Sequence, residues 1–409
     1  MKHIWKRAMA VLLVSVMVAP LCLGCGDENG EGKVTITIGE ITDLTGPASP
    51  AIITLHYALE DMVRHYNEEE IIPGVKLDIV SWDTKYDAAR QVPGYDWVRG
   101  KGAKVIISVT PDTGVYLKPF ADRDEFPLFN LSTDLGMLEP PGWVFTMSTP
   151  ISWGLVTLMD WVRENHWDDD LGTPKIGLVG WAENVIVSID ADIEDYVEKN
   201  PDEWEYAGVR TTPFGTVTWS GEVDALKDCD YVCAYGFPTG AIINEFHERG
   251  YSPVFLDSMT GSAYRGFLMD LVGFPGLDGM LSANISLYRD QTTPMVEQAK
   301  EILDRYRPGE AEEIIAAGFS YIGGWHNLTA AFQILHQAID AVGAENLTSQ
   351  AIYDAAVNYK ATGAIWEGYP EWNFSPTKRY LINDVTMYEF QEAAGDMVRI
   401  TDYWIPLVK

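Results

Sequence analysis

The stretch VIISVTPDTGVYLKPFADRDEFPLFN, residues 105–130, decides the fold class. Residues 105–109 form a short apolar run rich in β-branched side chains, and residues 127–130 form a second apolar run. Between them, the segment from Thr113 to Asp122 is long enough for one crossover helix. Two short apolar runs joined by a helical segment predict a strand, a helix and a parallel strand.

The same alternation extends in both directions along the chain. On the N-terminal side, two strand-like runs flank apolar residues at helical spacing: 34–38, then Ile52, Leu55, Leu59 and Met62, then 77–80. On the C-terminal side, three further runs are each followed by a plausible helix: 176–179, 230–235 and 254–256. Alternating strands and helices predict an α/β protein with two doubly wound parallel-sheet lobes.

Helix signals also mark the C-terminal part of the chain. Leu328, Phe332, Leu335 and Ile339 form an apolar stripe at helical spacing. Gly343 then lies where a helix end is expected, and Thr348 or Ser349 can cap the next helix.

The first 25 residues have the pattern of an export signal. Basic residues at the start precede an apolar run over residues 8–24, which is shorter than the ~20 residues of a spanning helix. Residues 21–25, LCLGC, resemble the lipobox of bacterial lipoproteins, which implies a lipid on Cys25 that anchors the chain to the membrane. Ordinary secretion is the alternative. Residues 26–33 are polar and glycine-rich, as expected of a tether.

Charge and cysteines restrict the partners and the covalent structure. The formal net charge of −31 repels phosphate backbones, so nucleic acid is not expected as a partner. Cys229 and Cys233 are four residues apart. On an extended strand their Cα atoms would be separated by ~13 Å, beyond the ~7 Å limit for a disulfide, so both are expected to stay unpaired.

An ordered series of segments resembles a known family. The stretch GEITDLTGP from Gly39 to Pro47, the acidic strand end at Asp83 and the apolar strand 105–109 resemble the type I periplasmic binding proteins of the branched-chain amino acid family, such as Leu/Ile/Val-binding proteins. Residues 279–283 and 323–342 continue the resemblance, which covers residues 33–409. It implies two lobes joined by three crossovers: 33–148 plus 284–358 for lobe one, and 149–283 plus 359–409 for lobe two.

The resemblance also implies a function. The chain would be the extracytoplasmic substrate-binding component of an ABC importer, located in the periplasm or at the cell surface. Its lobes would close over a small polar or aromatic solute, such as an amino acid, an amide or a carboxylate, and deliver it to permease and ATPase subunits. The chain is expected to act as a monomer without a cofactor.

Ligand-binding residues follow from the family's loops. The loops after the third and fourth strands supply hydroxyl and backbone donors to a ligand carboxylate, which implies Thr110, Pro111, Thr113, Ser132 and Thr133. Turn capping is the alternative role for these hydroxyls.

Lobe two is expected to contribute aromatic and acidic groups. Phe237 matches the family's aromatic residue, and Trp181 follows the strand 176–179 toward the cleft. Asp257 is the candidate partner for a ligand ammonium, although it lies nearer the strand than the family's glutamate, whose position falls near Met259 or Thr260.

Catalytic signatures are missing from the sequence. The seven histidines show no HExxH spacing, and no P-loop or GxGxxG follows a strand. Around Ser320, the stretch GFSYI lacks the last glycine of a nucleophile elbow. The sequence thus predicts no enzyme, no metal and no cofactor. A ligand-sensing module for a separate receptor or kinase is the first alternative, and a secreted α/β hydrolase is the less favoured one.

Overall fold

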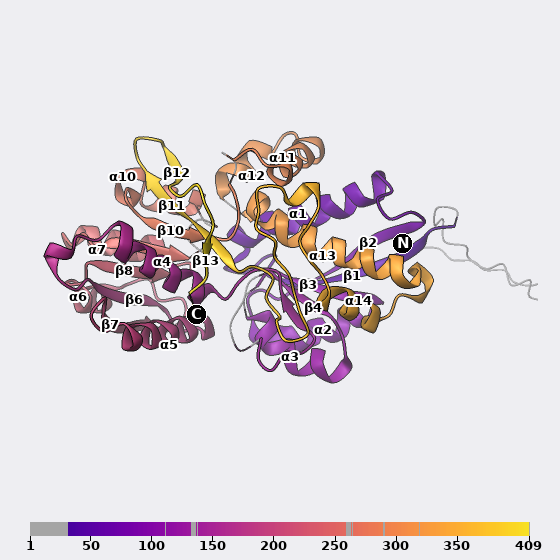
Figure 1. The fold of residues 1–409 in the computed structure, drawn as a ribbon, viewed down its shortest axis with the longest axis horizontal. Coiled ribbons are helices and arrows are strands. Elements are labelled where there is room, and N and C mark those ends of the chain that lie inside the picture. The colour runs from indigo at the N-terminus through magenta and orange to yellow at the C-terminus, as the bar shows by residue number, and fades with distance from the viewer. Residues whose placement is uncertain are drawn as a thin grey trace, which may run out of the picture. The chain divides into compact units, whose positions relative to one another are not determined.

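Two β-sheets with helices on their faces make up the protein (Figure 1). The computed structural model describes residues 32–110, 112–131, 136, 138–258, 263, 265–288, 291–318 and 320–408. The predicted signal, residues 1–25, and most of the predicted tether lie outside these residues.

The first sheet is parallel throughout and has the strand order β2-β1-β3-β4-β5. Its strands are β1 (Val34–Thr42), β2 (Val75–Asp83), β3 (Ala103–Ser108), β4 (Leu128–Asn130) and β5 (Val144–Thr146). The first four confirm the strands predicted from apolar runs. The strand β5 was not predicted: β4, equally short, follows a predicted crossover helix, whereas no predicted helix precedes β5.

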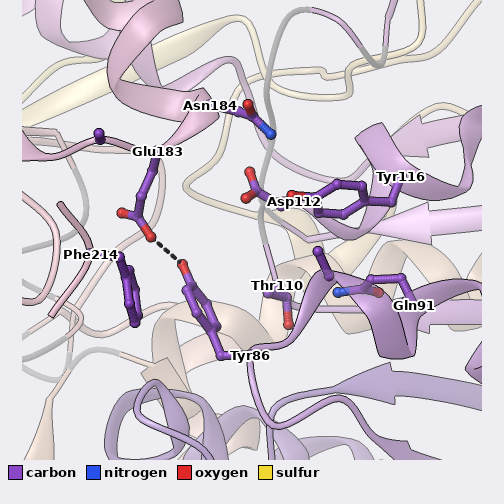
Figure 2. Close-up of a pocket in the computed structure, with 10 residues that line it drawn as sticks. Tyr86, Gln91, Thr110, Asp112, Tyr116, Glu183, Asn184 and Phe214 are labelled. Carbon is purple, nitrogen blue, oxygen red and sulfur yellow. Dashed lines mark hydrogen bonds between the residues drawn. The ribbon is translucent and has the colours of Figure 1, made fainter.

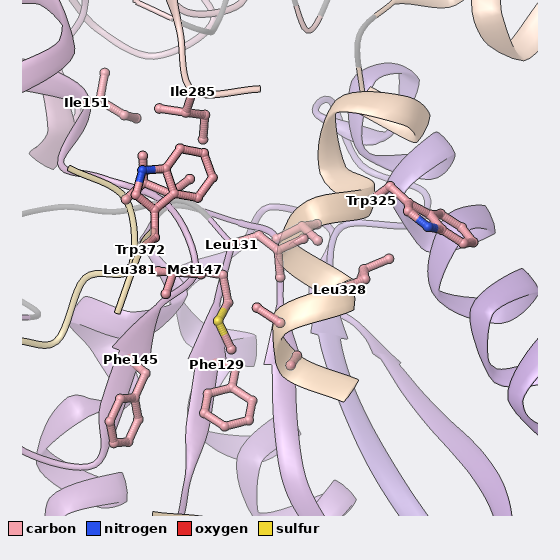
Figure 3. Packing of buried hydrophobic residues seen from close by; sticks show 14 of the residues in the cluster. Phe129, Leu131, Phe145, Met147, Ile151, Ile285, Trp325, Leu328, Trp372 and Leu381 are labelled. Carbon is pink, nitrogen blue, oxygen red and sulfur yellow. The ribbon is translucent and has the colours of Figure 1, made fainter. Parts of the chain in front are cut away.

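Helices cover both faces of this sheet, which explains the unbroken apolar runs. Successive residues alternate between the faces: Val105 and Ile107 belong to one buried cluster, and Ile106 to another. One face carries α1 (Ser49–Glu68), α11 (Pro294–Tyr306), α13 (Ser320–Val342) and α14 (Ser349–Val357), and the other carries α2 (Gln91–Gly100) and α3 (Thr113–Asp124). Figure 3 shows Leu328 of α13 near Leu131 and Met147 in this packing.

The second sheet has the order β12-β11-β10-β9-β8-β6-β7, with β13 paired to β11. Its strands are β6 (Lys175–Trp181), β7 (Glu205–Thr212), β8 (Tyr231–Tyr235), β9 (Val254–Ser258), β10 (Leu281–Asn284), β11 (Asp384–Gln391), β12 (Asp396–Arg399) and β13 (Ile405–Pro406). Its helices include α4 (Ile151–Asn165), α5 (Asn184–Lys199), α6 (Ser220–Ala225), α7 (Thr239–Glu248), α9 (Arg265–Leu271) and α10 (Phe274–Leu277). The short α12 (Ala311–Ala317) contacts both α9 and α13.

Two α/β lobes are therefore present, as predicted, but the second sheet is not wholly parallel. The strand β11 runs antiparallel to β10, and both β12 and β13 run antiparallel to β11. No strand was predicted after residue 283, because these C-terminal strands add to an existing sheet edge and only tertiary pairing defines them.

Several local predictions are confirmed. The helix α13 ends at Val342, and Gly343 follows with φ of 82°, a left-handed conformation that suits glycine. The Thr348 side chain accepts a hydrogen bond from the Ala351 backbone N–H and caps α14. Cys229 and Cys233 are both free and buried.

Candidate functional site

A polar cavity of about 210 Å³ lies where strands of both sheets end. Its walls come from the loops and helices that follow the carboxyl ends of β2, β3, β6 and β7. The lining residues are Tyr86, Ala88, Gln91, Thr110, Asp112, Tyr116, Ala182, Glu183, Asn184 and Phe214 (Figure 2). Open α/β sheets present ligand sites at such strand ends.

A hydrogen bond joins the lobes beside this polar cavity. The Tyr86 hydroxyl, from the loop after β2, donates to Glu183 Oε1 over 3.1 Å (Figure 2). Tyr116 on α3 and Asn184 at the start of α5 line the same cavity from the two lobes. The Tyr86–Glu183 bond connects a loop of the first sheet to a loop of the second, so a change in the separation of the lobes would break it.

The loop that carries Tyr86 has a strained backbone. Lys85 and Tyr86 have φ values of 53° and 56°, which are unfavourable for residues with a Cβ. Hydrogen bonds hold the loop in place: Asp83 Oδ1 accepts from the Lys85 N–H, and the Thr84 hydroxyl oxygen accepts from the Tyr86 N–H. Strain that the surrounding structure maintains is typical of functional positions.

Glu183 is the titratable group most affected by this environment. Burial raises its pKa from 4.5 to about 7, the nearby Asp112 carboxylate adds to the increase, and the hydrogen bond from Tyr86 opposes it. Glu183 is therefore close to half-ionised at neutral pH.

A larger apolar cavity of about 690 Å³ lies on the other side of several aromatic rings. Its lining is Pro47, Pro50, Trp181, Thr216, Val217, Phe237, Pro238, Ala241, Arg265, Gly266, Phe267, Met269, Asp270, Leu271, Glu313, Ala316 and Ala317. Volumes of 300–1,000 Å³ are usual for small-molecule pockets.

Aromatic contacts separate the two cavities. The Phe214 ring stacks on Tyr86 with centroids 5.7 Å apart and packs against Trp181 at 4.6 Å. The Phe237 ring lies edge-on to Tyr86 at 6.0 Å. Tyr86 and Phe214 line the polar cavity, whereas Trp181 and Phe237 line the apolar one.

The structure brings one predicted lobe-one residue into the polar cavity. Thr110 lines it, is 2% exposed, and its hydroxyl has no hydrogen-bond partner among the described residues. Thr113 begins α3, and its buried hydroxyl likewise has none there, but it does not line this cavity. Pro111, Ser132, Thr133 and the predicted lipid attachment residue Cys25 lie outside the described residues.

The predicted lobe-two residues lie in different places. Trp181 and Phe237 line the apolar cavity, where the Trp181 indole N–H donates to the Thr216 carbonyl oxygen over 2.9 Å. Asp257 lies within β9, is 1% exposed, and accepts a hydrogen bond from the Ser282 hydroxyl over 2.8 Å. It lines neither of these two cavities.

Gln91, Glu183 and Phe214 line the polar cavity but were not predicted as site residues from the sequence. Glu183 follows the predicted strand 176–179 by a few residues, so its acidic side chain at a strand end was an available signal. Phe214 follows β7, which has mixed burial and was not predicted. Gln91 begins α2, and no local pattern distinguishes it from other helix-start residues.

Other features limit the chemistry of the described residues. Within them, no helix is long and apolar enough to cross a membrane, and no three metal-binding side chains gather into a cluster. Ser320 begins α13, and its hydroxyl donates to the Ala263 carbonyl oxygen over 3.2 Å. The helix α13 follows the helix α12 and not a strand, so Ser320 does not lie on the strand-to-helix turn of a hydrolase nucleophile.

Two α/β lobes with cavities at their strand ends define a two-lobed solute-binding protein. The family model described as periplasmic binding protein matches residues 35–396, and the chain belongs to that family. It is a periplasmic or extracellular binding protein and not an enzyme, as the sequence predicted. Among curated proteins, none matches this chain.

Solved structures share the fold at low sequence identity. A branched chain amino acid ABC transporter protein from Thermus thermophilus with bound valine has a TM-score of 0.79 and 20% identity, over 92% of this chain and 97% of that one. A fatty acid ABC transporter substrate-binding protein from Thermomonospora curvata has a TM-score of 0.75 and 16% identity, over 91% and 95%. A Rhodopseudomonas palustris solute binding protein in complex with 4-hydroxybenzoate has a TM-score of 0.73 and 14% identity, over 92% and 97%.

Proposed function

We propose that this protein is the extracytoplasmic substrate-binding component of an ABC importer. A small solute binds between lobe one, residues 33–148 plus 284–358, and lobe two, residues 149–283 plus 359–409. The lobes close over it, and the monomeric chain, anchored through Cys25, delivers it to permease and ATPase subunits. Family membership and the ABC transporter proteins of the same fold support this proposal.

One observation supports the proposed site most directly. The interlobe bond from Tyr86 to Glu183 borders the same cavity that the unsatisfied Thr110 hydroxyl lines. A buried hydroxyl without a partner costs about 1–3 kcal/mol, which a ligand that bonds to it would recover. Closure about the crossovers then makes ligand binding and interlobe contacts mutually dependent.

A screen for thermal stabilisation tests the proposal. Amino acids, amides, aromatic acids, amines and small carboxylates are added to the purified protein, and a solute present at 100 times its dissociation constant adds ~2.7 kcal/mol to the free energy of unfolding. Small-angle scattering should then show a smaller radius of gyration with that solute, because the lobes close. A solute that stabilises the protein without changing its scattering contradicts the proposal.

Thr110 variants localise the binding. Replacing Thr110→Val keeps the side-chain shape but removes the hydroxyl, and should weaken binding by about 1–3 kcal/mol. Thr110→Ser keeps the hydroxyl and should bind nearly as tightly as the wild type. The exposed Thr173→Ala is the control outside the cavity. ATPase stimulation of the reconstituted permease by the loaded protein separates transport from sensing.

A further inference from the structure

The polar cavity is rich in hydrogen-bond acceptors and negative charge. Asp112 from lobe one and Glu183 from lobe two both line it, and Asp112 is close enough to raise the pKa of Glu183. Among the described residues that line this cavity, none is Lys, Arg or His. An anionic ligand group placed there would meet two acidic side chains and no basic one, which disfavours a carboxylate.

Two buried side chains that line this cavity each have an oxygen atom that makes no hydrogen bond to the described residues. The Thr110 Oγ1 and Gln91 Oε1 atoms have no partner within the described part of the chain, and each residue is 2% exposed. Buried polar atoms are normally satisfied, so a ligand group in this cavity that donates to these two atoms would supply the hydrogen bonds that the protein does not. An amide oxygen is satisfied only by a donor, and a hydroxyl oxygen can also accept.

Aromatic rings provide the remaining walls of the polar cavity. Tyr86, Tyr116 and Phe214 line it alongside the two carboxyl groups (Figure 2). The faces of aromatic rings attract organic cations. With a volume of about 210 Å³, the cavity has room for about seven water-sized groups, enough for an ammonium group and part of its carbon skeleton.

We propose that the polar cavity binds the positively charged group of an organic ammonium ion, with Glu183 and Asp112 as its counter-charges and Gln91 and Thr110 as its hydrogen-bond acceptors. This inference rests on the proposed function and names the class of solute for that site. The net charge of −31 also favours it, because an acidic protein concentrates cations at its clefts.

The rings of Tyr86, Tyr116 and Phe214 can contact the carbon skeleton of such a solute inside the polar cavity. An alkyl or aryl group attached to the ammonium would be removed from water against these rings. The proposed ligand is therefore an amine with a small apolar substituent.

Binding of the cation should depend on pH in a defined direction. The groups that face Glu183 are Asp112, Tyr86 and Tyr116, and its pKa lies near 7. An ammonium ion binds the ionised carboxylate of Glu183. Below pH 7 most of this carboxyl group is protonated, and it must lose its proton when the cation binds. Affinity should consequently fall about tenfold from pH 8 to pH 6, while the amine itself stays protonated throughout.

Matched pairs of probes test the proposal on the full protein. The amines 2-phenylethylamine and butylamine are compared with 3-phenylpropionate and pentanoate, which have a carboxylate in place of the ammonium. Thermal shift and calorimetry should show binding of the amines, about tenfold weaker at pH 6 than at pH 8. Glu183→Gln should weaken amine binding about 30-fold or more and abolish the pH dependence.

The exposed Glu198→Gln on α5, the helix that Glu183 precedes, removes the same charge away from the cavity and should leave both measurements unchanged. Binding of the carboxylates in preference to the amines overturns the cation inference but keeps the proposed function. Amine binding that Glu183→Gln leaves intact also overturns it. If neither series stabilises the protein, the inference is wrong, and the proposed function is judged by the other solutes of the screen.

Discussion

His56 should stabilise the first lobe through its positive charge. Its Nδ1 atom lies 2.8 Å from Glu40 Oε2, and its Nε2 atom lies 3.3 Å from Glu60 Oε1. Glu40 is 1% exposed, and the Ser81 hydroxyl also donates to its Oε2 atom over 2.6 Å. Replacing His56→Gln leaves a buried carboxylate without its cation, so the variant should be less stable.

The size of this effect follows from the pKa of His56. Burial by itself would lower this pKa, but the hydrogen bonds and charges of Glu40 and Glu60 outweigh burial and raise it from 6.5 to about 10. A change of that size corresponds to roughly 5 kcal/mol. Because His56 and Glu60 are partly exposed, screening reduces the expected contribution to about 2 kcal/mol.

The pH range of the effect is also defined. A raised histidine pKa stabilises the folded state fully below pH 6.5, and this contribution is lost as the pH rises through 10. Urea unfolding at pH 6, 8 and 10 should therefore show the wild type losing about 2 kcal/mol more than His56→Gln over this range. Equal losses in the two proteins would refute the reasoning.

A surface histidine supplies the control for this experiment. His336 Nε2 lies 3.6 Å from Asp340 Oδ2, and the two side chains are 30% and 69% exposed. Solvent screens such a pair, so His336→Gln should change the free energy of unfolding by less than about 0.5 kcal/mol. A large loss in this variant would mean that histidine substitution itself, and not the buried pair, causes the effect.

Two further predictions concern close packing and buried thiols. A Cβ on Gly154 would lie 2.4 Å from Ser258 Oγ, so Gly154→Ala should destabilise the protein by about 1–3 kcal/mol in urea unfolding, and adding Ser258→Ala should restore much of the loss. Burial raises the pKa of Cys229 to about 11 and raises that of Cys233 as well. Peptide mapping should find neither thiol alkylated by iodoacetamide at pH 8 until urea unfolds the protein, and modification of the native protein would contradict the buried placement.

Local sequence patterns were sufficient to predict a strand where all of its residues are buried. Residues 105–109 sit in a sheet covered on both faces, so every side chain is apolar or small and the run is visible without its neighbours. In β7 every residue except Thr212 is exposed or only partly buried, and β11 to β13 depend on pairing with a distant edge. Their sequences therefore carry weaker signals.

The residues of the candidate site could also be predicted from the sequence only in part. Thr110 was implied by the family resemblance, as part of the loop after the third strand, and the structure places it in the polar cavity. Glu183 and Phe214 join it from lobe two, 73 and 104 residues further along the sequence. The spatial meeting of such residues depends on how the lobes pack.

By itself, the sequence determined the alternation of strands and helices, the two α/β lobes and the lack of a catalytic motif, because burial period and turn chemistry are local properties. Only the tertiary structure decided that Tyr86 and Glu183 form a hydrogen bond and that Asp257 is buried inside β9. It also decided that hydrogen-bond acceptors line one cavity and apolar side chains line the other. The charge and shape of a cleft between lobes depend on contacts between distant segments, which no local pattern records.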